Sequence, residues 1–393
     1  MQIKKILFIF LLCFILIQCK KNENSVDSSN CTKTIETNNI FNPETNIRLG
    51  VIFSMSGSEA ITNQESVYGV KLAVERINAE GGILGKKIYL SIYDNNSTAI
   101  GSKLACEQAV KDGVIGIIGC QYSSHSLGAA PIAQAAGIPM ISNISTNEDV
   151  TLVGDYIFRV CFIDSFQGII ISNFAYKELK AKTASIMINA DADYSKEIAK
   201  YFKEDFTKLS GIVIGEYYFQ AVDKDFSNQL SEIKKNNPNI LFVPAYLKEA
   251  ALICKQARIM GITAAIIGSD GWSHKMLKYA GEYLEGCYYI NHWTQTDDKK
   301  NIEFVKEYYK SYGEIEIPAI AALAYDAVFL LSDAIKRAGS FDKKFIRDSI
   351  ANTKNFQGIT GTISFDKNRN PVKTAFIVKF QNDKVVLDKI IIP

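Results

Sequence analysis

The sequence predicts an α/β protein with two doubly wound parallel sheets, because short apolar segments alternate with amphipathic segments along almost its whole length. A parallel strand covered by helices on both faces has a short continuous apolar run, and such runs recur between the helical segments. Glycines and one Asn-Pro pair follow several predicted helices, as expected at helix ends. The pattern occurs in two successive series, so we expect two units of the same architecture.

The first series occupies residues 48–142 and the second begins at residue 184. The first has strands at residues 48–53, 87–94, 115–119 and 140–142 and helices at residues 68–79, 101–112 and 124–136. The second has strands at residues 184–188, 212–218, 240–243 and 264–268 and helices at residues 194–209, 226–236 and 248–260. Helices at residues 320–338 and 343–353 follow, and the alternation within residues 361–392 predicts a β-hairpin around residues 368–371.

The chain begins with a predicted signal peptide at residues 1–18. Two lysines precede an apolar run at residues 6–17, which suits a secretory signal and is too short to span a bilayer. The run ends at Gln18-Cys19, which resembles a bacterial lipobox, although Gln18 departs from its usual small residue. We expect lipidation of Cys19; the alternative is an ordinary signal peptide with a chance cysteine.

Residues 19–46 predict a flexible tether, because they are polar and rich in Asn, Ser, Thr and Lys. A tether behind an acylated cysteine holds a protein on a membrane surface. We therefore expect an exported protein, anchored on the periplasmic or outer face of a bacterial membrane.

The charge and the cysteine and histidine spacing give no sign of nucleic acid, metal or cofactor binding. The net charge is +2 and the charges are mixed along the chain, which argues against a nucleic-acid surface. The six cysteines beyond Cys19 match no zinc motif, and only Cys106 and Cys120 form a nearby pair for a disulfide. The three histidines lack metal-ligand spacing, and we interpret them as surface or rim residues.

The residues that directly follow the strands are the candidate binding residues, because ligands of open parallel sheets bind outside the carboxyl ends of the strands. These positions are residues 54–57, 122–124, 144–146, 189–194, 246 and 270–272. Ser123 and Ser124 lie at the start of the helix at residues 124–136, whose free amide groups attract an anion. Together with Ser145 and Thr146, which follow the neighbouring strand, these two serines predict a binding site for a carboxylate. Helix capping by the two serines is the alternative.

Asp270 follows a buried strand of the second series, where it would face the predicted carboxylate-binding site. A carboxylate in this place suits an ammonium group, and capping of the next helix is the alternative. We interpret Tyr246 and Trp272 as pocket walls, with plain packing as the alternative.

The sequence lacks the local motifs that are typical of enzymes such as hydrolases and dehydrogenases. The Gly-rich stretch at residues 81–87 follows a helix and has neither the gap nor the Ser or Thr of a phosphate-binding loop. Neither a GxSxG nor a GxGxxG motif occurs. His125 beside Ser123 is the one nucleophile–base pair that can be constructed, and a residue on the same helix start is badly placed as a base for its neighbour. We therefore expect a binding protein and not an enzyme.

The chain resembles the leucine/isoleucine/valine-binding proteins, which are the amino-acid receptors of type I periplasmic-binding fold. The resemblance covers residues 47–393. It is carried by the order and spacing of short segments, at residues 50–57, 69–78, 81–85, 93–94, 118–119, 123–124, 137–141, 164–168, 194, 225–226, 256–258, 268–271 and 324–327.

The resemblance implies two lobes that are joined by three crossing strands and close over an amino acid. It implies a first lobe of residues 47–164 plus 294–374 and a second lobe of residues 165–293 plus 375–393. It also implies a monomer that delivers the amino acid to the permease of an ABC importer. A sensor or adaptor subunit of the same fold, without transport, is the alternative.

The resemblance also assigns roles to the strand-end residues. Ser123 and Thr146 would bind the α-carboxylate of the ligand. Thr146, the carbonyl group of Ile144 and Asp270 would bind its ammonium group, and Tyr194 and Tyr246 would close over it.

Three positions depart from the branched-chain receptors. Asp270 stands where those receptors carry Glu, and Tyr122 and Trp272 stand where smaller side chains are usual. An α-amino acid still fits, and its side chain is left open as small, polar or aromatic.

Overall fold

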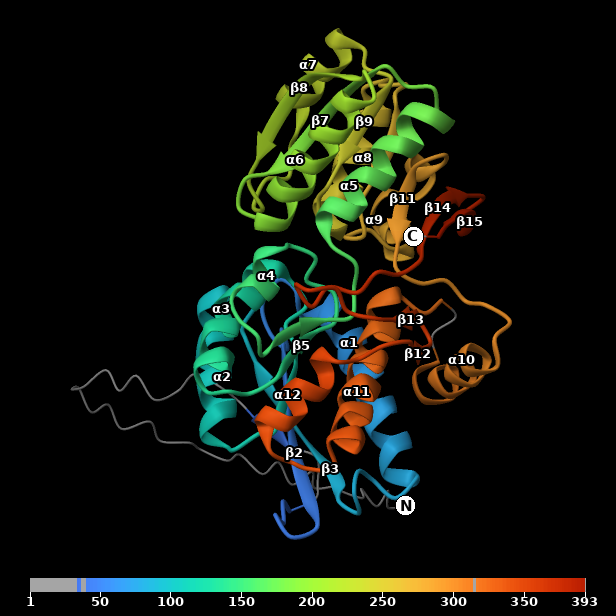
Figure 1. The fold of residues 1–393 in the computed structure, drawn as a ribbon. Helices are drawn as coiled ribbons and strands as arrows, with labels where there is room; N and C mark the ends of the chain where they lie inside the picture. Colours follow the sequence, from blue (N-terminus) through green and yellow to red (C-terminus); the bar gives the residue numbers. More distant parts are fainter. Residues whose placement is uncertain (1–33, 37–39, 314–315, 393) are drawn as a thin grey trace, which may run out of the picture. The chain divides into compact units, whose positions relative to one another are not determined.

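A computed structural model describes residues 34–36, 40–313 and 316–392 (Figure 1). The predicted signal peptide, Cys19 and most of the predicted tether lie outside the described residues. Within the described residues, none of the helices combines the length and the apolar character that crossing a bilayer requires.

The first lobe is built on a six-stranded sheet of order β1-β3-β2-β4-β5-β6. All neighbours pair in parallel except β1, which is antiparallel to β3. Its strands are β1 (Thr34–Glu36), β2 (Asn46–Phe53), β3 (Lys87–Asp94), β4 (Gly116–Gly119), β5 (Met140–Ser142) and β6 (Ile157–Arg159). Its helices are α1 (Ala60–Ala79), α2 (Ala99–Lys111), α3 (Ser123–Ala135), α4 (Asp149–Leu152), α10 (Lys299–Tyr312), α11 (Ala319–Ala338) and α12 (Lys343–Ala351), beside a small sheet of β12 (Phe356–Gly358) and β13 (Gly361–Ile363).

The second lobe is built on a seven-stranded sheet of order β15-β14-β11-β10-β9-β7-β8. Its strands are β7 (Thr183–Asn189), β8 (Ile212–Phe219), β9 (Ile240–Val243), β10 (Ala265–Gly268), β11 (Tyr288–Asn291), β14 (Ala375–Gln381) and β15 (Lys384–Ile391). Its helices are α5 (Asp164–Asn173), continued as a π-helix at η1 (Phe174–Glu178), α6 (Asp193–Lys208), α7 (Ser227–Asn236), α8 (Leu247–Ile259) and α9 (Leu277–Ala280), with the 3₁₀-helices η2 (His274–Met276) and η3 (Gly281–Leu284). The five strands from β7 to β11 are parallel to their neighbours, and β14 and β15 are antiparallel additions.

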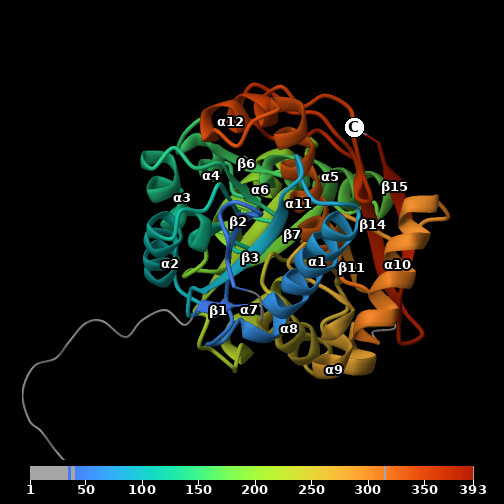
Figure 2. The ribbon, with the colours of Figure 1, turned by 90° about the horizontal axis from the view of Figure 1, so that it is seen from below.

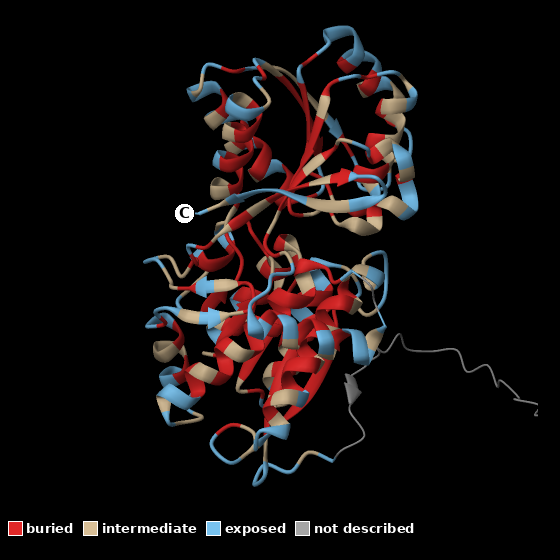
Figure 3. Cartoon of the chain, turned by 90° about the vertical axis from the view of Figure 1, so that its right-hand side faces the viewer, coloured by how far each residue is buried: buried red, intermediate tan, exposed pale blue. Residues whose placement is uncertain are grey.

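Helices cover both faces of the first-lobe sheet, as the apolar strands predict. α1 and α11 lie on one face and α2 and α3 on the other, each with its own apolar core (Figure 2). The strands are buried along most of their length, whereas the outer sides of the helices are exposed (Figure 3). α1 and α11 approach closely at Gly69, where a Cβ would overlap the carbonyl oxygen of Ala321.

The chain passes between the two lobes three times. The passages lie between β6 and α5, between β11 and α10, and between β13 and β14. Contacts join them, because the ring of Phe162 in the first stacks on His292 in the second at 3.6 Å, and Lys373 in the third donates to the carbonyl oxygen of Val160 in the first at 3.3 Å. The boundary residues of the two predicted lobes stay a prediction.

The sequence-based prediction of the elements is wrong in several places. The elements that were not predicted include α4, β6, the helix from Asp164 to Glu178, β11 and α10, and α1 begins eight residues earlier than the predicted start at residue 68. The predicted hairpin around residues 368–371 is reduced to a tight turn with one isolated antiparallel bridge between Phe365 and Pro371, because β13 pairs with β12 and β14 pairs with β15. The turn of the actual hairpin lies at Asn382 and Asp383, both with positive φ, which suits a two-residue turn.

The cysteines within the described residues are buried and free. Cys106 and Cys120 therefore form no disulfide and pack as small apolar residues in the core between α2, α3 and the sheet.

Candidate functional site

A cavity of about 260 Å³ lies between the two lobes, at the carboxyl ends of the strands. Of the predicted site residues, eight line it: Tyr122, Ser123, Ile144, Thr146, Tyr194, Tyr246, Asp270 and Trp272. Ser124 and Ser145 do not, nor do residues 54–57. Because lining residues come from both lobes, a ligand in the cavity would touch both.

Ser123 and Thr146 stand at the ends of two neighbouring strands, as predicted. Ser123 begins α3, and its Oγ accepts a hydrogen bond from the backbone amide of Asn147 at 3.2 Å. The Oγ1 of Thr146 is buried and has no hydrogen-bond partner among the described residues. A buried hydroxyl without a partner is costly, so this group is suited to a ligand.

Ser124 and Ser145 have other partners. The Oγ of Ser124 donates to Asp193 at the start of α6, in the second lobe, at 3.1 Å. Ser145 is fully buried, and its Oγ lies 2.7 Å from Ser126 Oγ and 3.1 Å from the carbonyl oxygen of Cys120. Ser124 therefore joins the lobes, and Ser145 joins the β5 end to the start of α3.

Asp270 follows β10 and is held by two donors. Its Oδ1 accepts from the hydroxyl of Tyr194 at 2.7 Å, and its Oδ2 lies 2.8 Å from Nε2 of His292. Burial lowers the pKa of His292, against the pull of Asp270. An imidazole that carries a proton on Nε2 donates a hydrogen bond to Asp270 and holds this carboxyl group in place.

Two of the three histidines are not surface or rim residues as expected, whereas His274 is partly exposed and lines the cavity. His292 is fully buried in the passage between β11 and α10, and His125 is buried beside Tyr122. Nδ1 of His125 lies 3.4 Å from the side-chain nitrogen of Asn95, and burial lowers the pKa of this histidine to about 4. His125 is therefore part of the packing at the start of α3.

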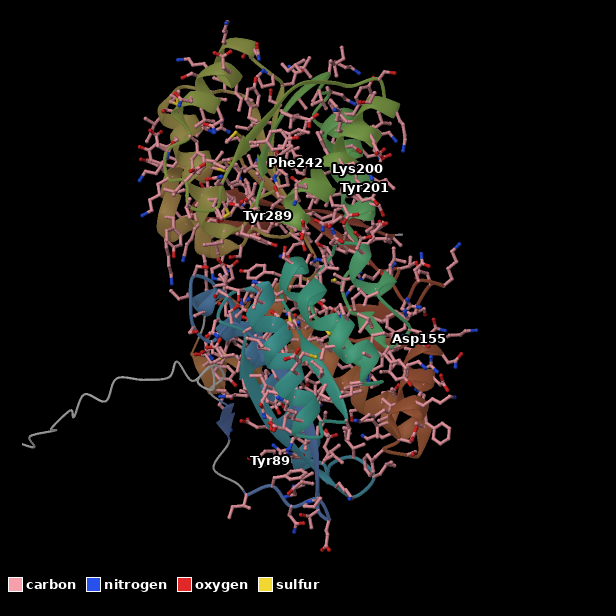
Figure 4. All side chains as sticks on the ribbon, turned by 90° about the vertical axis from the view of Figure 1, so that its left-hand side faces the viewer. Tyr89, Asp155, Lys200, Tyr201, Phe242 and Tyr289 are labelled. Atoms are coloured by element: carbon pink, nitrogen blue, oxygen red, sulfur yellow. The ribbon has the colours of Figure 1, made fainter. Side chains whose placement is uncertain are left out.

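Aromatic rings form a continuous wall of the cavity. Tyr194 and Tyr246 stack at 5.1 Å, and Tyr122 meets Tyr246 edge-on at 4.4 Å across the lobes. Trp272 borders the cavity, but its indole is almost entirely buried in the second-lobe core and donates to the carbonyl oxygen of Val243 at 3.1 Å. Tyr289 of β11, labelled in Figure 4, also borders the cavity and packs in the same core.

Three further residues were missed by sequence reasoning. Arg159 is fully buried, and its guanidinium donates to the carbonyl oxygens of Ser145 and Asn147 at 2.6 and 2.7 Å. Glu65 and Gln121 line the cavity. Arg159 and Glu65 follow no strand end that faces the cleft, and only Gln121, directly before Tyr122, stood close to a predicted position.

The predicted site also has a second buried carboxylate beside Asp270. Asp164 begins α5, and burial together with the charge of Asp270 raises its pKa well above the usual range. Its Oδ2 has no hydrogen-bond partner among the described residues. Asp164 and Asp270 therefore form a pair of buried carboxyl groups at this side of the cavity.

Comparison with known proteins finds a matching family model and several similar chains. Residues 46–384 match the model of a family described as periplasmic binding protein. A Leu/Ile/Val-binding protein homolog of Brucella melitensis is 27% identical over 86% of this chain and 93% of its own length.

Two solved structures are similar in fold and in sequence. A leucine binding protein, LivK, of Thermotoga maritima has a TM-score of 0.84 and 35% identity over 88% of this chain and 99% of its own. A branched-chain amino acid transporter substrate binding protein, LivJ, of Streptococcus pneumoniae, in complex with isoleucine, has a TM-score of 0.84 and 36% identity over 89% and 100%.

These similarities confirm the predicted α/β fold of two doubly wound lobes and the resemblance on which it rested. They also confirm that the chain is a binding protein and not an enzyme, because the family consists of substrate-binding proteins of transporters. The chain belongs to the periplasmic binding protein family, among the extracytoplasmic solute-binding proteins related to the branched-chain amino-acid receptors.

Proposed function

We propose that this protein captures a free α-amino acid between its lobes and delivers it to the permease of an ABC importer. The observation that carries the proposal is the pairing of unlike groups in one cavity. Ser123 and Thr146 of the first lobe offer hydroxyls near a helix start, and Asp270 of the second lobe offers a carboxylate. The names of the similar proteins, which refer to leucine, isoleucine and valine, support an amino acid as ligand.

The proposed roles follow from these positions. Ser123 and Thr146 bind the α-carboxylate, Asp270 and the carbonyl group of Ile144 bind the ammonium group, and Tyr194 and Tyr246 pack over the ligand. A ligand that touches both lobes stabilises the closed state by the contacts that exist only there.

Calorimetric titration with the twenty amino acids tests this function. At least one should bind to the purified protein. The Asp270→Asn substitution should weaken that binding about 10- to 100-fold, because a charge-assisted hydrogen bond contributes about 1.5–3 kcal/mol. Asp333→Asn, on the exposed side of α11, is the matched control and should leave binding unchanged. Binding that is equally tight in the Asp270→Asn protein would contradict the site assignment.

We also propose that the protein is a lipid-anchored monomer. The proposal rests on the lipobox-like sequence at Cys19, followed by a polar tether. In a bacterial host, a metabolically supplied alkyne fatty acid should label the wild type and not the Cys19→Ala protein, which should leave the membrane fraction. Labelling of both proteins would contradict acylation at Cys19. Sedimentation of the tether-free protein at one protomer mass would support the monomer.

A further inference from the structure

The part of the cavity next to α1, here called the α1 end, is polar although the fold around it is apolar. Thr62 and Glu65 of α1 line it, together with Gln121 from the β4–α3 loop. Lys275 of η2 reaches Glu65 from the second lobe and forms an ion pair with it. The proposed carboxylate and ammonium contacts, Ser123, Thr146 and Asp270, are other lining residues of the cavity, so the α1 end is available to the side chain of the ligand.

Gln121 presents a donor to this space. Nδ2 of Asn143 donates to Ser66 Oγ at 3.0 Å, and Ser66 Oγ donates to Gln121 Oε1 at 2.7 Å. This chain of hydrogen bonds fixes the side-chain amide of Gln121 with its oxygen toward α1. Its Nε2 is the remaining polar end of a side chain that is only 4% exposed and lines the cavity. A nearly buried amide donor at a cavity favours an acceptor on the ligand.

The ion pair of Glu65 and Lys275 sets the charge that the ligand side chain meets. The two side chains are 5% and 13% exposed and come from different lobes, so the pair is removed from water when the lobes are together. Because the charges of this pair balance, the pair itself attracts neither a cationic nor an anionic side chain. Glu316 lines the cavity beside Ile317, and burial raises the pKa of its carboxyl group to about 7. The carboxylate oxygens of Glu65 still accept hydrogen bonds from a neutral donor.

An apolar wall stands beside these polar groups. Ile317, Pro318 and Ala319, at the start of α11, also line the cavity. The close approach of α1 and α11 at Gly69 and Ala321, one turn further along both helices, places this wall next to Glu65. A ligand side chain in the α1 end would therefore place its methylene groups against this apolar wall and its tip against the polar groups.

We propose that the ligand of this protein is an amino acid with a neutral carboxamide side chain, selected by Gln121, Glu65 and Lys275. The amide oxygen accepts from Nε2 of Gln121, the amide NH₂ group donates to Glu65, and the methylene groups lie against the start of α11. A branched aliphatic side chain offers no partner to Gln121 and removes water from the ion pair, so it binds more weakly. This inference rests on the proposed function, because it takes an α-amino acid in the same cavity.

Calorimetric competition between glutamine, asparagine, leucine, isoleucine, valine, lysine and glutamate tests the proposal. The wild type should bind glutamine or asparagine at least tenfold more tightly than leucine. Gln121→Leu should weaken carboxamide binding about tenfold and leave leucine binding unchanged or tighter. Gln108→Leu is the matched control, because Gln108 lies on α2 and its amide donates to Asp112 outside the cavity.

A second variant keeps the test decisive where Gln121→Leu fails to fold. The double substitution Glu65→Leu and Lys275→Met replaces the ion pair by apolar groups and should shift the preference toward leucine. The proposal is overturned where the wild type binds leucine, lysine or glutamate more tightly than both carboxamides, or where neither variant changes the preference. If leucine binds and Asp270→Asn abolishes its binding, the proposed function stands and only this inference fails. If no amino acid binds, both fail.

Discussion

Arg159 is a buried cation that holds the chain segment between β5 and α4. Its Nη1 donates to Ser145, and its Nη2 donates to Asn147 and, at 3.2 Å, to the Oγ1 of Thr151. Thr146 lies between the two carbonyl groups that Arg159 binds. The guanidinium therefore fixes the backbone that presents Thr146 to the cavity, without touching the cavity itself.

Replacement of Arg159 by Met should lower both stability and ligand affinity. The substitution keeps the apolar stem and leaves buried carbonyl groups without donors, so we expect a loss of about 2–4 kcal/mol in the free energy of unfolding. Urea denaturation measures the stability, and titration with the best amino acid measures the affinity. Arg159→Lys, which keeps the charge and loses the forked geometry, should lie between the two. An unchanged urea midpoint for Arg159→Met would contradict this role.

At the residue scale, sequence reasoning finds the groups that follow a strand. Ser123, Thr146 and Asp270 were predicted because the carboxyl ends of parallel strands share one edge of a sheet. Arg159 and His292 were not, because their roles come from hydrogen bonds to segments that only the fold brings near. The assignments of Ser123, Thr146 and Asp270 as ligand contacts stay predictions until binding is measured.

At the scale of elements, the strands and most helices follow from hydropathy. β3, β5 and β9 have the predicted bounds, because each is a short apolar run between clear helix ends. α5 was not predicted, since its apolar residues Ile169, Ile170 and Ile171 are consecutive and give no helical spacing. The hairpin was misplaced because two Asn-rich segments compete as turns, and pairing with β11 decides between them.

The packing of α1 on α11 gives a prediction at this scale. Gly69→Ala should destabilise the protein by about 2 kcal/mol or more, because a Cβ at this position overlaps the backbone carbonyl of Ala321 and the two helices must move apart. Thermal and urea unfolding measure the effect. Gly81→Ala is the control, since its Cβ meets open space and its cost is limited to the positive φ of 100°. A loss of stability in Gly69→Ala no greater than that in Gly81→Ala would contradict the close packing of α1 on α11.

At the scale of the whole molecule, direct contacts between the lobes surround the cavity. Ser124 binds Asp193, Tyr201 of α6 (labelled in Figure 4) donates to Glu148 at 3.0 Å, and Lys248 donates to the carbonyl oxygen of Ser58 at 3.1 Å. These contacts would open when the lobes separate. A ligand in the cavity therefore adds its contacts to those that the two lobes already make with each other.

One carboxylate opposes the approach of the lobes. Burial, and next the charge of Glu59 of the first lobe, raise the pKa of Glu249 on α8 to about 7. Because folding raises this pKa, the folded state binds more protons than the unfolded state between pH 4.5 and 7. The contribution of Glu249 to stability is thus present at low pH and lost as the pH rises through 7.

Replacement of Glu249 by Gln should remove this loss. At pH 8 the variant should be more stable than the wild type by about 1 kcal/mol, and at pH 5 the two should be nearly equal. Urea unfolding at both pH values measures the difference. Glu232→Gln, on the exposed side of α7, should show no such pH dependence. An equal effect of Glu249→Gln at both pH values would contradict the assignment.

The central claim is that the cavity binds the carboxylate and the ammonium group of a free amino acid together. The most direct measurement is calorimetric titration of the tether-free protein with its best amino acid, with the N-acetyl derivative and with the α-carboxamide derivative of that amino acid. We predict that the free amino acid binds and that each blocked derivative binds at least 100-fold more weakly, since each loses charge-assisted hydrogen bonds of about 1.5–3 kcal/mol apiece. Equal binding of either blocked derivative, or no binding of any amino acid, would contradict the account.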